Sequence, residues 1–165
     1  MYPQSKYYLV TSLSSSCSNS INNLLEDSGE SKHFTRYCEI LSNLVERVSN
    51  LKIILWNNYT HHVKGTDFAS IHLDSSQAIH LQDVLYASSL KKNLVSIFSM
   101  KDKGFRVAFI NGNVLAWPRK YKLRASFTLG VKNEGLYRMC GQPIQALVHD
   151  TTNQCELLAP KICLP

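Results

Sequence analysis

The feature that most constrains this fold is an Asn-Gly pair between two runs of alternating apolar residues. The first run contains Phe105, Val107 and Phe109, and the second is Val114–Trp117. Asn111-Gly112 is a preferred pair for a two-residue type I′ turn, because both central residues of that turn need a positive φ. The sequence therefore predicts an antiparallel hairpin at 105–117 with the three alternating residues on its buried face.

Short apolar runs of strand length recur along the rest of the chain, separated by polar and turn residues. They are Leu51–Trp56, Phe68–Leu73, Ile79–Leu81, Val84–Tyr86, Leu94–Phe98, Phe127–Val131 and Leu136–Met139. A short helix is also predicted after Thr35, which we expect to cap it. Its apolar face would comprise Ile40, Leu41, Leu44, Val45 and Val48. Many short strands and few helical stretches predict a mostly β protein.

Composition places the chain among intracellular globular proteins. The apolar share is 44%, which is enough for a core, and no apolar run is long enough to span a bilayer. The five cysteines are odd in number and scattered, which favours reduced thiols in the cytoplasm or nucleus over secretion. Neither Cys nor His shows the spacing of a zinc site. We expect no metal, no cofactor and no membrane partner.

The net charge of +6 is unevenly distributed. Residues 91–138 carry eleven Lys and Arg against two Asp and Glu, a net charge of +9, whereas residues 1–90 carry six against eight, a net charge of −2. This basic block predicts either contact with nucleic acid or a solvated cationic face. The candidate nucleic-acid contacts are Lys91, Lys92, Arg106, Arg119, Lys120, Lys122 and Arg124.

Asp27-Ser28-Gly29 is the candidate catalytic motif. In an aspartic protease the Asp faces a second, equivalent Asp and the two share one proton. A Ser hydroxyl can hydrogen-bond to the facing loop, and Gly lets the two loops approach closely. The tripeptide alone is also a common turn sequence, so its neighbourhood must decide between the two interpretations.

The neighbourhood of Asp27 resembles copia-type retrotransposon polyproteins. Leu25–Thr35 is similar to the segment W-L-I-D-S-G-A-S-K-H-M-T that holds the catalytic Asp of that family. Leu81–Tyr86 resembles its L-x-D-V-L-Y strand, and Leu90–Ser96 resembles the L-K-K-N-L-[LI]-S that closes the barrel. Further similarity, to the GAG-pre-integrase region, occurs at 102–107, Asn111-Gly112, 135–138 and 155–157.

This resemblance implies a fragment of a polyprotein with several parts. We expect a flexible Ser-rich leader at 1–23, a retropepsin-like β-barrel at 24–100, a second small β-rich pre-integrase segment at 101–157, and an irregular tail at 158–165. If the barrel is an active aspartic endopeptidase, Asp27 is its catalytic residue, supported by Ser28 and Gly29. A homodimer is then required, because each chain supplies one such motif, and a polyprotein is the implied substrate.

Several positions depart from the family pattern. Glu26 replaces an apolar residue before the Asp, Glu30 replaces Ala after the Gly, and Asp67 replaces a Gly in the expected flap at Val63–Asp67. Extra carboxylates near a pair that already repels itself predict an inactive, degenerate protease. Two alternatives remain open: a non-catalytic β-barrel that binds nucleic acid or protein through residues 91–138, and a decaying remnant without a selected function.

Overall fold

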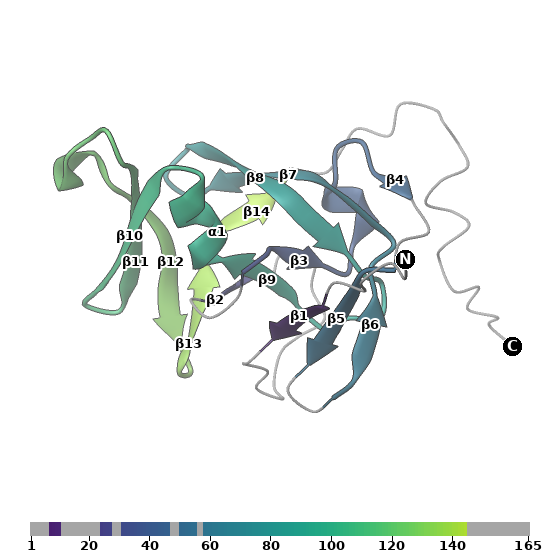
Figure 1. Ribbon diagram of the computed structural model, residues 1–165. Coiled ribbons are helices and arrows are strands. Elements are labelled where there is room, and N and C mark those ends of the chain that lie inside the picture. Colours follow the sequence, from purple (N-terminus) through teal and green to yellow (C-terminus); the bar gives the residue numbers. More distant parts are fainter. Residues whose placement is uncertain (1–6, 11–23, 28–30, 47–49, 56–57, 145–165) are drawn as a thin grey trace, which may run out of the picture.

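A curled, mostly antiparallel sheet dominates the computed structural model, which describes residues 7–10, 24–27, 31–46, 50–55 and 58–144 (Figure 1). The strands in chain order are β1 (Tyr7–Val10), β2 (Leu24–Asp27), β3 (Phe34–Thr35), β4 (Val45–Glu46), β5 (Lys52–Leu55), β6 (Thr60–His62), β7 (Gly65–Leu73), β8 (Ala78–Tyr86), β9 (Asn93–Ser96), β10 (Phe105–Ile110), β11 (Asn113–Pro118), β12 (Phe127–Asn133), β13 (Leu136–Met139) and β14 (Gly141–Pro143). Among the described residues, the helices are α1 (Ile97–Asp102) and two 3₁₀ turns, Cys38–Ile40 and Leu123–Ala125. The mostly β fold class is therefore confirmed.

Two sheets contain these strands. The larger one runs in the order β10-β11-β12-β13-β2-β9-β3-β8-β7-β14, with β4 paired to β7, and it curls into a half-barrel (Figure 1). The smaller one has the order β1-β5-β6, and β1 lies within the stretch predicted to be a leader. The larger sheet continues without a break past residue 100, which lies inside α1. The division into a barrel and a pre-integrase segment stays a prediction.

The predicted hairpin is confirmed. β10 and β11 pair antiparallel from Phe105↔Pro118 to Ile110↔Asn113, and Asn111 and Gly112 have φ of 49° and 77°. A second turn of the same kind joins β12 to β13, where Glu134 and Gly135 have φ of 50° and 82°. Positive φ at both central residues is the signature of type I′, whose twist matches that of the strands.

The predicted buried face of this hairpin is only partly right. Phe105 and Val107 are half-buried and pack against the main core, but Phe109 is 43% exposed. Phe109 lies near the turn, beyond the covered part of the sheet, and its ring meets Tyr137 edge-on at a centroid distance of 4.8 Å. The alternation identified the correct face of the strand, but not how far along the strand that face is covered.

The helix predicted after Thr35 is wrong. Thr35 belongs to β3, and only the 3₁₀ turn Cys38–Ile40 follows. Leu41 then bridges to Ala69, and Val45 pairs with Thr66. Val48 lies outside the described residues. In its extended conformation this segment pairs its backbone with β7. Such tertiary pairing overrides weak helical periodicity.

Leu94–Phe98 was predicted as one strand, but it divides between two elements. β9 ends at Ser96, and α1 begins at Ile97. The Ser96 hydroxyl accepts a hydrogen bond from the Ser99 N–H (2.9 Å), which is a standard N-cap. Within the described residues no helix is long and apolar enough to span a membrane.

The stretch expected to form a flap is instead built into the sheet. Gly65 pairs with Tyr86 on one side and with Glu46 on the other. A Cβ at Gly65 would lie 2.7 Å from Leu44 Cδ1 and 2.9 Å from the Val45 carbonyl oxygen. Glycine at this position therefore lets β4 lie against β7.

Replacing Gly65 with Ala tests this close approach. The new methyl group overlaps a backbone oxygen that cannot rotate away, so we expect the free energy of unfolding to fall by about 1–3 kcal/mol. Urea denaturation of wild type and Gly65→Ala measures the change. An unchanged midpoint would contradict the packing of β4 on β7.

Candidate functional site

The candidate catalytic residue Asp27 lies at the end of a central strand. β2 is parallel to β9, with Asp27 opposite Ser96, and antiparallel to β13 on its other side. The backbone of Asp27 is thus fixed where β2 leaves the sheet. Ser28 and Gly29 lie outside the described residues, as does Glu30.

Ser96 forms a buried polar junction beside Asp27. It is fully buried, and its hydroxyl caps α1 as described above. Its backbone N–H donates to the Nδ1 atom of His33 at 3.0 Å. One residue therefore connects the strand next to Asp27, the start of α1 and a histidine far away in sequence.

His33 is the principal buried titratable group described near this junction. Its side chain is 2% exposed, and its carbonyl oxygen accepts the Leu85 N–H at 2.9 Å. Burial, with a smaller contribution from the charge of Lys32, lowers the pKa of His33 from 6.5 to about 4. The ring is neutral at pH 7, and because Nδ1 accepts a hydrogen bond, Nε2 carries the proton. His33 lies within the Leu25–Thr35 segment that resembles the copia-type motif, but the sequence alone predicted no role for it.

A second buried polar pair holds β3 against β9. The Thr35 hydroxyl donates to Asn93 Oδ1 at 3.0 Å, and the same oxygen accepts the Arg36 N–H at 3.1 Å. Thr35 and Asn93 are each about 1% exposed. Satisfied buried polar groups of this kind fix a single register, because any slip would leave them without partners.

The backbone of Glu26 lies between two neighbouring strands. Its position in β2 lies opposite Val95 on β9 and opposite Tyr137 on β13. Val95 is fully buried, and Tyr137 packs against the main core. The backbone of Glu26 is therefore surrounded by sheet on both sides.

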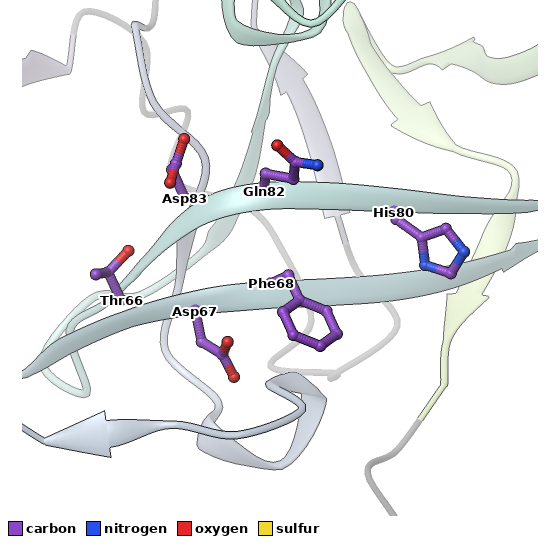
Figure 2. Close-up of a pocket in the computed structure, with 6 residues that line it drawn as sticks. All are labelled: Thr66, Asp67, Phe68, His80, Gln82 and Asp83. Atoms are coloured by element: carbon purple, nitrogen blue, oxygen red, sulfur yellow. The ribbon is translucent and has the colours of Figure 1, made fainter.

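An open pocket lies on the β7–β8 ribbon (Figure 2). Its volume is about 400 Å³, and it is lined by Thr66, Asp67, Phe68, His80, Gln82 and Asp83. A β-bulge between Asp67 and Ala69 shapes it, and Asp83 has a positive φ of 58°. The lining side chains come from both strands, and Asp27 is not among them (Figure 2).

Both carboxylates that line the pocket have partners. Asp67 accepts the Asn43 N–H, and Asp83 forms an ion pair with Lys103 at 3.1 Å. We therefore find no activated nucleophile in the described lining. Across the described ranges no three His, Cys, Asp or Glu side chains are grouped as a metal site would require.

The predicted nucleic-acid contacts lie on three parts of the chain. Lys91 and Lys92 precede β9, Arg106 lies on β10, and the other four belong to the β11–β12 connection. All are exposed except Lys92, which is half-buried. Four of the seven, Arg119, Lys120, Lys122 and Arg124, lie within six consecutive residues of this connection, where the charge is therefore most concentrated.

The comparison with protein families identifies the region around Asp27. Residues 24–105 match the family model described as Pol polyprotein, beta-barrel domain. Over these residues the chain is similar to the β-barrel domain of retroelement Pol polyproteins. The match spans β2 to the start of β10 and so includes the parallel β2–β9 pair. Comparisons with curated proteins and with solved structures found no match.

The depressed pKa of His33 predicts a pH dependence of stability. Between pH 6.5 and about 4 the unfolded chain binds a proton at this histidine and the folded chain does not, so stability falls as the pH falls. The loss approaches about 3 kcal/mol at pH 4. Urea unfolding between pH 7 and 4 measures it.

His33→Asn is the informative variant, because it removes the titrating group and keeps an acceptor for the Ser96 N–H. We expect it to flatten the pH dependence, whereas His62→Asn, at an exposed position, leaves it as in wild type. Identical pH profiles for wild type and His33→Asn would contradict the buried neutral histidine.

Proposed function

We propose that this β-barrel is the retropepsin-like aspartic endopeptidase region of a copia-type polyprotein, in a copy with little or no peptidase activity. The observation that carries the proposal is the position of Asp27 at the end of β2, a central strand held by β9 and β13. Such a strand end is rigid, and catalytic groups need that rigidity. The motif Asp27-Ser28-Gly29 and the family match support the same assignment.

The chemistry would require two copies of the chain. Asp27 of each copy would face the other across a two-fold axis, and the pair would share one proton. The ionised carboxylate would take a proton from a water molecule as that water attacks the peptide carbonyl. The protonated one would donate to the carbonyl oxygen. The substrate class is a polyprotein.

Glu26 and Glu30 argue against efficient catalysis. In a dimer they bring four extra carboxylates close to the two Asp27 residues. Two like charges about 7 Å apart repel by about 2 kcal/mol at an effective dielectric constant of about 20. Several such terms rival the stability of a small dimer, so we expect dimerisation to fail first.

Peptidase assays on three variants test this proposal. We expect wild type to show little or no pepstatin-sensitive cleavage near neutral pH, and Glu26→Ile with Glu30→Ala to raise dimerisation and activity together. Asp27→Ala in the double-variant background should abolish the gain. Robust wild-type activity that is lost in Asp27→Ala would contradict the prediction that this copy has little or no peptidase activity. Activity that survives Asp27→Ala would contradict the aspartic-protease assignment.

A second candidate function is nucleic-acid binding through the basic block. The observation that favours it is the exposure of six of its seven predicted contacts. Among the described residues, the ion pair made by the basic block is that of Lys103 with Asp83. Lys103 is not one of the seven predicted nucleic-acid contacts. Affinity for nucleic acid should therefore fall steeply between about 50 and 200 mM salt. A chain that neither cleaves nor binds would match the remnant alternative.

A further inference from the structure

We propose that the β11–β12 connection, residues 119–124, is a docking site for single-stranded nucleic acid. In this site the cations contact phosphates and Tyr121 stacks on an unpaired base. The inference rests on the second candidate function and names the part of the basic block that carries it. We refer to residues 119–124 as the basic loop.

The basic loop combines charge with exposed apolar surface. Its sequence is Arg-Lys-Tyr-Lys-Leu-Arg, with four cations and no acidic residue. Tyr121 is 51% exposed and Leu123 is 49% exposed. An exposed tyrosine between cations is a common arrangement in proteins that bind single strands, where aromatic rings stack on bases and cations follow the backbone.

The backbone of the basic loop is held in place. The Arg119 N–H donates to the Gly104 carbonyl at 2.7 Å, the Tyr121 N–H donates to the Pro118 carbonyl at 2.9 Å, and the Ala125 N–H donates to the Lys122 carbonyl at 2.9 Å. The loop extends from the end of the sheet, away from the rest of the half-barrel (Figure 1). A loop already ordered loses less conformational entropy on binding.

Side-chain contacts divide the roles within the loop. The Arg119 guanidinium donates through Nη2 to the Lys101 carbonyl at 3.0 Å, which anchors the loop to α1. The Lys120 ammonium lies 5.2 Å from the centre of the Tyr121 ring and adds positive charge beside it. Among the described residues, Lys122 and Arg124 have no acidic partner within salt-bridge distance. These two are therefore the main candidates for phosphate contacts.

The exposed ring favours a single strand over the alternatives. In a duplex the bases stack on one another, so Tyr121 would have no base face to contact, whereas a single strand offers one. An anionic membrane would attract the same cations, but two apolar side chains bury too little surface for stable insertion. Nucleic acid is therefore the partner that uses both the charge and the ring.

Fluorescence anisotropy with the full chain tests the inference. The probe is a labelled oligouridylate of about 20 nucleotides, measured at several salt concentrations between 50 and 200 mM. Lys122→Ala with Arg124→Ala should weaken binding about tenfold at the lowest salt and lower the salt slope by about 1.4, because two phosphate contacts are lost. Lys101→Ala with Lys132→Ala removes the same charge from exposed positions that lie outside the loop and are not among the seven predicted contacts, and it should weaken binding less than about threefold.

The stacking role has its own control. Tyr121→Ala should weaken binding of the oligouridylate about fivefold or more and leave the salt slope unchanged, because stacking releases no counterions. Tyr59→Ala, at a 69% exposed tyrosine, should have no effect. Binding to a duplex RNA of the same length should not respond to Tyr121→Ala.

The outcomes separate the two levels of the proposal. Equal losses in the two double variants, or full affinity in Tyr121→Ala, would overturn the basic loop while leaving nucleic-acid binding by the block intact. Tighter binding of wild type to phosphatidylserine vesicles than to the oligouridylate would overturn it in favour of a membrane. No binding of wild type to either RNA at 50 mM salt would remove both the inference and the second candidate function.

Discussion

The pairing of β2 on both of its edges is the constraint on which this architecture depends. On one edge β2 runs parallel to β9, and on the other it runs antiparallel to β13. Its four residues thus join the part of the larger sheet formed by β10–β13 to the part formed by β9, β3, β8, β7 and β14. Without β2, β9 and β13 would each expose an edge of unpaired amides and carbonyls. The same pairing fixes the backbone of Asp27, so the fold and the candidate site depend on one short strand.

Buried hydrogen bonds fix the register of β9, the parallel neighbour of β2, against β3. A shift of β9 by one residue would separate Asn93 from Thr35 and the Ser96 N–H from His33. A buried polar group left without its partner costs about 1–3 kcal/mol, so a shifted register would lose several such contributions at once. Apolar contacts supply most of the stability, whereas these bonds fix the register of β9, the strand beside Asp27, against β3. The buried, neutral His33 therefore has a structural role as the acceptor of the Ser96 N–H.

Local turn chemistry made part of this fold predictable. Asn111-Gly112 identifies its hairpin because the required backbone conformation is nearly exclusive to such residues, and the alternation of Phe105 and Val107 gives the strand face. α1 was missed because its first turn continues the apolar run of β9, so only the capping role of Ser96 marks the boundary.

The predicted helix after Thr35 failed for the opposite reason. Its periodicity was real, but β7 offers backbone partners that no local pattern reveals. The motif located Asp27, whereas His33 and Ser96 emerged only from contacts between segments 63 residues apart. Such contacts leave no mark on local sequence.

The uneven charge of the chain raises the question of what joins its acidic and basic parts. The ion pair between Asp83 and Lys103 crosses from one to the other, but the two side chains are 54% and 43% exposed. Exposed pairs of this kind contribute about 0–1 kcal/mol, and salt screens them further. In contrast, Val114 and Leu129 from the basic part are fully buried in the same core as Ile71 and Leu73 from the acidic part. Each such side chain contributes about 1.5–3 kcal/mol on burial, so packing rather than charge holds the two parts together. The exposed cations therefore contribute little to holding the two parts together, which leaves them available for an acidic partner.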